Sequence, residues 1–237
     1  MTSRARRKYL GAVLLAFAVL SCPALASAQQ EPASPDPSPA QADGPRKSGD
    51  DRLLWVMPNV LTVRPSDAPP PLSARQKFGA VATSTFDLFE YPWYAATATV
   101  SQVNHSEPGF GQGASGYVKR YGANFTDGTI ENFMVGAVLP SILHQDPRYY
   151  EKASGGVARR ALYAVSRMAV TRTDKGKQSF NYSELIGSGI AAALANTYHP
   201  VGDRTVRNTL SVWRTLVGYD ALTALLKEFW PDIRRSL

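Results

Sequence analysis

The stretch Thr205–Trp230, TVRNTLSVWRTLVGYDALTALLKEFW, decides the fold class. Its large apolar residues recur at spacings of three and four, which places them along one side of an α-helix. These residues are Val212, Leu216, Tyr219, Leu222, Leu226 and Phe229. The spacing predicts a long helix over 205–230 whose apolar stripe packs into the core, and Pro231 predicts its end or a kink.

The segments upstream carry further helix signals. Ser73 follows three prolines and stands three residues before Gln76, the pattern of a capping box. Apolar periodicity and polar breaks predict the remaining helices over 73–87, 93–104, 113–145, 157–171 and 183–198. Glycine and alanine recur in these segments, and glycine costs ~1 kcal/mol in a helix interior unless helices pack closely there. We therefore predict an all-α fold, a compact bundle of about five or six Gly/Ala-rich helices.

An extended N-terminal arm is expected before these helices. The apolar stretches 53–57 and 60–63 are separated by Pro58, and β-branched residues with flanking prolines disfavour a helix there. Residues 29–51 are rich in Pro, Ala, Ser and Asp without apolar periodicity. Such a segment buries too little apolar surface to offset its ordering entropy, which predicts a disordered linker at 29–51. Residues 52–237 are expected to form a single helical domain.

Residues 1–28 have the pattern of a secretory signal peptide. A basic cluster, Arg4–Lys8, precedes the apolar run 10–20, within the ~7–15 residues typical of such peptides. This run is shorter than the ~20 residues that a membrane-spanning helix requires. Small residues at Ala26 and Ala28 predict cleavage before Gln29.

A lipid anchor at Cys22, the only cysteine of the chain, is the alternative. Bulky Leu20 before it and Pro23 directly after it match a lipoprotein site poorly. Cleavage after Ala28 would leave a mature protein without cysteine, hence without disulfides. We expect an exported protein that is periplasmic or envelope-associated, and no segment of its sequence indicates a membrane-spanning helix.

The charge balance argues against nucleic acid as a partner. The formal net charge is +7, but four of the basic residues lie in the leader, and removing them leaves +3. A surplus of this size does not indicate a nucleic-acid groove. The partners that remain are an envelope protein or an anionic membrane surface, and the sequence leaves the oligomeric state open.

One group of polar residues supports a catalytic hypothesis. His144 and Asp146 stand two apart at an expected helix end, and Glu131 shares a helix face with Asp127. Imidazole and carboxylate groups can act as acid and base or hold a zinc-like ion. No complete ligand spacing such as H-E-x-x-H is present, and His144 near a helix C-terminus also has an ordinary structural role. We therefore predict no metal site and no cofactor.

Arginines supply the candidate ligand-binding residues. Arg148, Arg167 and Arg172 lie close together in the sequence, among several tyrosines. Guanidinium groups hold phosphates, lipid headgroups or acidic glycans through charge-assisted hydrogen bonds. The favoured interpretation is internal ion pairing, in which Arg167 and Arg172 pair with carboxylates such as Glu184.

Four stretches resemble a family of secreted bacterial proteins of unassigned function. They are GYVKRYG at 116–122, LHQDPRYY at 143–150, SRMAVTRTD at 166–174 and EFWPDI at 228–233. The resemblance covers about 54–235 and implies export and a common domain. It implies no activity and no catalytic residue.

These patterns favour an exported cell-envelope protein with a noncatalytic binding or structural domain. The alternative is an envelope hydrolase or transferase that acts on an anionic lipid or glycan. In that alternative His144, Asp146 and Glu131 would supply acid, base or metal-ligand groups while the arginines hold the substrate. Geometry distinguishes the two, because an enzyme needs these groups in one pocket.

Overall fold

The computed structural model describes residues 52–236. The predicted signal peptide, the Cys22 alternative and the linker at 29–51 lie outside this range. The helices are α2 (Ala74–Thr85), α3 (Glu90–Val103), α4 (Gly113–Phe133), α5 (Leu139–Ile142), α6 (Val157–Ser166), α7 (Tyr182–Ala195) and α8 (Val206–Ser236), with short 3-10 turns η1 (Pro108–Phe110) and η3 (Val201–Asp203) and a π-helical segment η2 (Met134–Val138).

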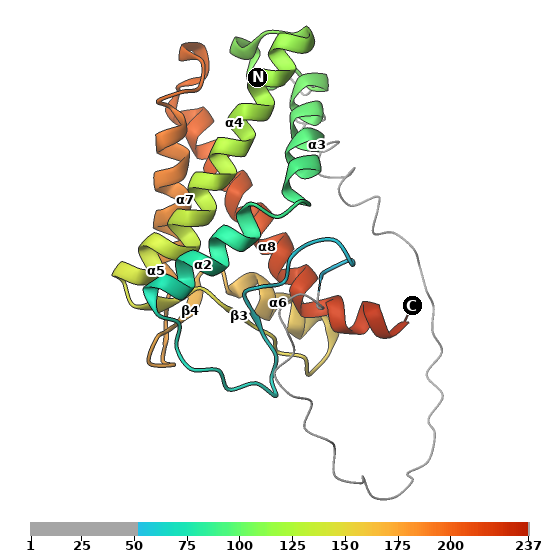
Figure 1. Ribbon diagram of the computed structural model, residues 1–237, viewed down its shortest axis with the longest axis vertical. Coiled ribbons are helices and arrows are strands. Elements are labelled where there is room, and N and C mark those ends of the chain that lie inside the picture. The colour runs from blue at the N-terminus through green and yellow to red at the C-terminus, as the bar shows by residue number, and fades with distance from the viewer. Residues whose placement is uncertain (1–51, 237) are drawn as a thin grey trace, which may run out of the picture. The chain divides into compact units, whose positions relative to one another are not determined.

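The described domain is mostly helical, as the sequence predicts. Helix α4 packs against α3 and α7, and α8 packs against α7 and α6 (Figure 1). Ser73 caps α2 through the predicted capping box, since its side chain accepts a hydrogen bond from the Gln76 backbone while the Gln76 side chain accepts one from the Ser73 backbone. No described helix combines the length and apolar character needed to cross a membrane.

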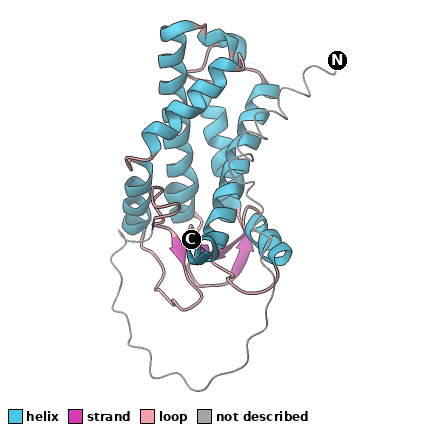
Figure 2. Ribbon diagram, turned by 90° about the vertical axis from the view of Figure 1, so that its right-hand side faces the viewer, coloured by secondary structure: helices cyan, strands magenta, loops and turns pink. Residues whose placement is uncertain are grey.

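Two small sheets lie together at one end of the helices (Figure 2). Strand β1 (Thr62–Val63) pairs in parallel with β3 (Tyr149–Tyr150), and β4 (Val170–Thr173) pairs antiparallel with both β2 (Gln145–Asp146) and β5 (Gln178–Phe180). The predicted helices 157–171 and 113–145 therefore end early, at Ser166 and Ile142. The run Val170–Thr173 is rich in β-branched residues, and its pairing with two strands outweighs helix continuation.

The N-terminal arm is extended only in part. Strand β1 confirms the extended conformation near residue 62. Residues 53–57 instead form a tight turn closed by hydrogen bonds between Leu53 and Met57. Leu54 and Trp55 have positive φ angles of 50° and 62° in this turn.

Helix α8 continues past Pro231 to Ser236, so of the two outcomes predicted at this proline, an end or a kink, the end is wrong. A proline inside a helix removes one backbone hydrogen bond and costs ~3 kcal/mol. Arg160 of α6 bonds to residues on both sides of the proline, namely the Glu228 backbone carbonyl and the Asp232 carboxylate. These tertiary contacts hold the helix in place on both sides of the proline.

The interior is less apolar than the sequence indicates. None of the six apolar residues that predicted α8 is fully buried, and Tyr219 is exposed. Alanines fill many of the buried apolar positions, and charged side chains occupy several others. Buried charges are the informative feature of an interior, because they are rare unless paired. The candidate functional site lies among these buried charges.

Candidate functional site

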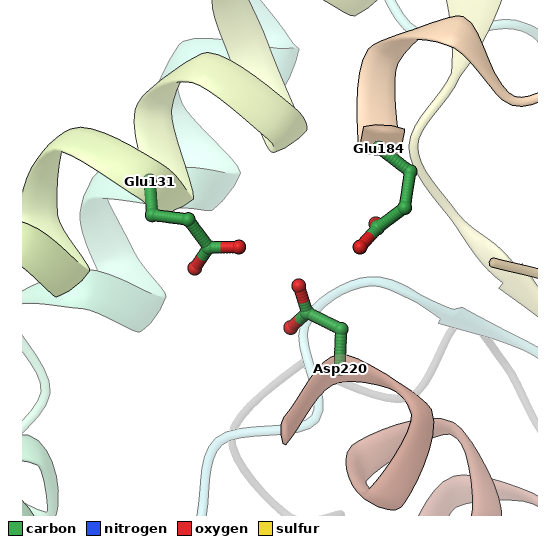
Figure 3. Close-up of side chains that lie close together, drawn as sticks. All are labelled: Glu131, Glu184 and Asp220. Atoms are coloured by element: carbon green, nitrogen blue, oxygen red, sulfur yellow. The ribbon is translucent and has the colours of Figure 1, made fainter. Parts of the chain in front are cut away.

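Three carboxylates from three helices meet inside the bundle. Glu131 lies near the C-terminal end of α4, Glu184 in the first turn of α7, and Asp220 in the middle of α8. One oxygen from each carboxylate lies within 4.8 Å of the other two. Figure 3 shows the three side chains pointing toward a common centre. We call Glu131, Glu184 and Asp220 the carboxylate triad.

Two members of the triad are buried, and one oxygen of each has no hydrogen-bond donor. Glu131 is 6% exposed and Glu184 is 5% exposed, whereas Asp220 is partly exposed. The Oε1 atoms of Glu131 and Glu184 are buried, and no group in the described range donates a hydrogen bond to either. Buried carboxylates normally have donors, because an unpaired charge in the interior is costly. The triad therefore has spare acceptor capacity directed at its own centre.

The protonation of the triad reflects this environment. Burial raises the pKa of Glu131 well above its usual range, and repulsion from Asp220 and Glu184 adds to the effect. Burial and then Asp220 raise the pKa of Glu184 in the same way. Like charges this close cannot all be ionised unless a cation or a shared proton stands between them.

One lysine lies near the triad without forming an ion pair with it. Lys227 follows Asp220 by two turns on α8. Burial lowers the pKa of Lys227 to about 8, and attraction to Asp220 opposes that change. Within residues 52–236, no salt bridge joins Lys227 to any triad member. Lys227 therefore reduces the local negative charge without occupying the centre.

The helical backbone is irregular just after Glu131. Pro140 has no N–H to donate to the carbonyl of Gly136, and the chain widens into the π-helical segment η2 just before it. In η2 the Leu139 N–H donates to the carbonyl of Met134, five residues back. Single π-helical turns are frequent at functional sites.

Close packing of α7 on η2 brings Glu184 toward Glu131. A Cβ atom at Gly187 would lie 3.1 Å from Val135 Cγ2 and 3.2 Å from the Val135 backbone nitrogen. A side chain at this position would force α7 or Val135 to shift by a few tenths of an ångström, so glycine favours this close approach. The predicted role of the glycines in close helix contact is confirmed at this position.

Carboxylate oxygens are the ligands that calcium, magnesium and manganese ions prefer. The triad offers at least three such oxygens from separate helices, and further ligand positions would be taken by water. It contains no histidine or cysteine, so its donors do not match a zinc site. Chemically, the arrangement can hold a hard divalent cation or share protons.

The structure gives the three catalytic candidates different neighbours. Glu131 belongs to the triad. Asp146 accepts two hydrogen bonds from the Arg148 guanidinium, at 2.9 and 2.6 Å, and one from Tyr150. His144 has an exposed side chain whose Nδ1 lies 4.0 Å from Asp174.

Two of the three arginine candidates share one region, and the third does not. Arg148 and Arg172 both line a pocket beside the small sheets. The Arg167 guanidinium lies 4.4 Å from the centre of the Tyr163 ring. The expected pairing of Arg167 and Arg172 with Glu184 is wrong, because Glu184 faces the other triad carboxylates instead.

A second polar cluster forms one helical turn before Glu131. His199 Nε2 lies 3.0 Å from Asp127, its Nδ1 lies 3.2 Å from Glu107, and Tyr198 donates a hydrogen bond to Asp127. Burial lowers the pKa of His199, but the hydrogen bonds to Asp127 and Glu107 outweigh it and raise the pKa to about 10. A charged imidazole between two carboxylates links the segment between α7 and η3 to α4 and to the chain before η1, which is a structural role. Asp127 and Glu131 therefore serve different clusters although they share a helix.

Sequence reasoning found one member of the triad and missed two. Glu184 and Asp220 belong to no ligand motif, and 36 positions separate them in the chain. A signal for Glu184 was present, because it is the only charged residue in α7, which otherwise consists of small, apolar and hydroxyl-bearing residues. A lone carboxylate in such a helix indicates an inward-facing functional group or a buried pair.

No family model, curated protein or solved structure matches this chain. The resemblance to secreted bacterial proteins therefore stays a prediction.

Proposed function

We propose that this protein is a noncatalytic binding domain of the cell envelope that holds a divalent cation at the carboxylate triad. One observation carries the proposal: three carboxylates converge within 4.8 Å inside the bundle, and two of them have buried oxygens without donors. Oxygen-only donors favour a hard cation such as calcium, magnesium or manganese. The bound ion would supply the positive charge that the triad otherwise lacks.

The position of the triad supports a structural or sensing role for the ion. Its members come from α4, α7 and α8, so a bound cation would tie three helices together. A ligand that binds only the folded state stabilises that state. The alternative hydrolase or transferase needs His144, Asp146 and Glu131 around one substrate, and their separate neighbours give it no support.

The envelope location rests on the sequence alone. The basic residues Arg4–Lys8, the apolar run 10–20 and the small residues at 26 and 28 support export. N-terminal sequencing of the mature protein tests it. A chain that begins at Gln29 is expected, whereas a lipid-modified Cys22 as the first residue would contradict cleavage at this site.

Isothermal titration of the metal-stripped protein with calcium, magnesium and manganese chlorides tests the cation site. We expect saturable binding of one ion by at least one of them. Glu131→Gln and Glu184→Gln should each weaken that binding about tenfold or more, because affinity depends on the number of charged ligands.

Glu90→Gln provides a matched control for these variants. Glu90 begins α3, and burial raises its pKa to about 7, yet it is not a member of the triad. The control should bind the cation as the wild type does. Absence of saturable binding for all three ions, or equal loss in the control, would refute the proposed site.

A further inference from the structure

A pocket of about 470 Å³ opens beside the small sheets, apart from the carboxylate triad. One wall is formed by the segment after β1, which contributes Pro65 and Pro69. The other is formed by Tyr150 and the β4–β5 hairpin, which contributes Arg172 and Lys175. Proline rings are stiff and apolar, so the segment after β1 brings apolar surface to the pocket together with Arg64 and Asp67, while the hairpin brings Arg172 and Lys175.

Two carboxylates on the cationic side of this pocket are already neutralised. Asp146 is held by Arg148 through two side-chain hydrogen bonds and by the Tyr150 hydroxyl. Asp174 accepts hydrogen bonds of 2.8 and 2.9 Å from the buried Lys77 ammonium group. Neither carboxylate is therefore available to balance a further positive charge.

Arg172 and Lys175 keep their charges directed at the pocket. Within residues 52–236, neither has a carboxylate within ion-pair distance. Asp146 is the cross-strand neighbour of Arg172, but its oxygens bond to Arg148 and Tyr150. The Arg172 guanidinium lies 4.0 Å from the centre of the Tyr150 ring, a cation–π contact that uses the face of the guanidinium and leaves its N–H groups able to donate.

Two other carboxylates, Asp67 and Glu151, also line the pocket. Asp67 accepts hydrogen bonds from the Arg64 backbone and the Ser66 hydroxyl. Both carboxylates would repel an anion placed next to them. Arg64 and Arg148 also line the pocket, but Arg148 is paired with Asp146, so an anionic group is favoured on the side of Arg172 and Lys175.

We propose that this pocket binds the phosphate group of a small polyol phosphate, with the phosphate on Arg172 and Lys175 and the carbon skeleton against the proline wall. A guanidinium held flat on a ring binds phosphate oxygens through paired, charge-assisted hydrogen bonds. The volume exceeds that of a bare phosphate ion, which leaves room for a glycerol- or sugar-sized group. Such a phosphate is found on soluble metabolites and on lipid headgroups alike.

Titration with glycerol 3-phosphate, followed by isothermal calorimetry, tests the pocket, with uncharged glycerol as the reference ligand. We expect saturable binding of the phosphate and none of glycerol. Arg172→Gln and Lys175→Gln should each weaken binding about tenfold, because a charge-assisted hydrogen bond is lost.

Lys177→Gln is the matched control. Lys177 lies on the same hairpin and is exposed, but it does not line the pocket. Removing its charge should leave binding unchanged. Equal weakening in all three variants would show that only the general charge of the hairpin attracts phosphate, and absence of binding to the wild type would overturn the proposal as well.

Vesicles separate the two sources of the phosphate. Sedimentation with phosphatidylglycerol vesicles should recover the wild type but not Arg172→Gln if the ligand is a lipid headgroup, while phosphatidylcholine vesicles should recover neither. Binding of glycerol 3-phosphate without binding to either vesicle would assign the pocket to a soluble phosphate. Recovery of wild type and variant alike would contradict a role of the pocket at a lipid surface.

Discussion

Glu228 and Glu131 are both buried carboxylates in the same helical domain, but their surroundings are opposite. Glu228 accepts hydrogen bonds from Tyr149, from Arg160 and from the backbone N–H groups of Lys152 and Ala153. Glu131 faces other carboxylates and has an oxygen without a donor. The donors hold the pKa of Glu228 below its usual value despite burial, whereas burial raises that of Glu131. The difference shows that this fold can satisfy a buried carboxylate fully, and a cation or a shared proton at the triad would explain why Glu131 is not satisfied in the same way.

The largest loss of unfolding free energy is expected at Glu228, the buried carboxylate that has hydrogen-bond donors. Glu228→Ala leaves the Arg160 guanidinium buried beside a cavity, with the partly exposed Asp232 as its remaining carboxylate. Breaking a buried ion pair by removing one partner costs about 3–5 kcal/mol. Urea denaturation of the wild type and the variant would measure this loss of unfolding free energy.

Asp232→Ala provides the control for that loss. Asp232 pairs with the same guanidinium, but its side chain is 46% exposed. Exposed ion pairs contribute about 0–1 kcal/mol, so this variant should remain near the wild type. A cost for Glu228→Ala no larger than that of Asp232→Ala would contradict a structural role for Glu228.

The next effect concerns the triad and depends on added cation. A cation at 100 times its Kd should raise the unfolding free energy of the wild type by about 2.7 kcal/mol, because it binds only the folded state. The Glu131→Gln/Glu184→Gln double variant should show no such increase. Thermal unfolding of the wild type and the double variant, with and without the ion that binds in the titration, measures this increase. An equal increase in the two proteins would show that the ion binds outside the triad.

A smaller change in unfolding free energy is expected at low pH, where Glu228 becomes protonated. Burial alone would raise the pKa of Glu228, but hydrogen bonds from Arg160, Lys152, Tyr149 and Ala153 lower it. A lowered carboxyl pKa stabilises the fold above the unfolded value near 4.5, and this stability is lost as the pH falls through the folded value. The advantage of the wild type over Glu228→Gln should therefore shrink between pH 6 and pH 3. Denaturation midpoints at several pH values measure this advantage, and a constant difference would show that Glu228 does not contribute through its charge.

Sequence patterns predicted the positions of the helices better than the burial of their side chains or the pairing of the strands. The periodicity at 205–230 and the Ser73 capping box located α8 and α2, because both depend on residues three or four apart. The same periodicity overestimated the burial of Leu216 and Leu226, since burial depends on which helices pack against the stripe. The strand at 170–173 was missed because its partners lie at 145–146 and 178–180, and cross-strand pairing outweighs local propensity.

The candidate site was still harder to predict. Glu131 was identified because Asp127 stands four residues before it. In the structure, however, Asp127 pairs with His199 and does not join the triad. Glu184 and Asp220 join Glu131 only through the packing of α4, α7 and α8. No local spacing encodes such a meeting, so a single sequence cannot place it.

The smallest change in unfolding free energy is expected for Glu131→Gln without any cation. This variant is also the sharpest test of the contrast between Glu131 and Glu228. The amide cannot ionise, so it removes the repulsion that an ionised Glu131 would meet, and it can donate a hydrogen bond to Glu184, whose Oε1 has no donor. Because like charges are relieved and a donor is gained, the unfolding free energy should stay the same or rise by about 1 kcal/mol. Urea denaturation in the presence of a chelator measures it. Functional sites commonly carry such unfavourable charge arrangements, and substitutions there stabilise the protein while removing its activity. A loss as large as that of Glu228→Ala would mean that Glu131 holds the fold together through its charge, and the contrast between the two carboxylates would no longer support a cation site.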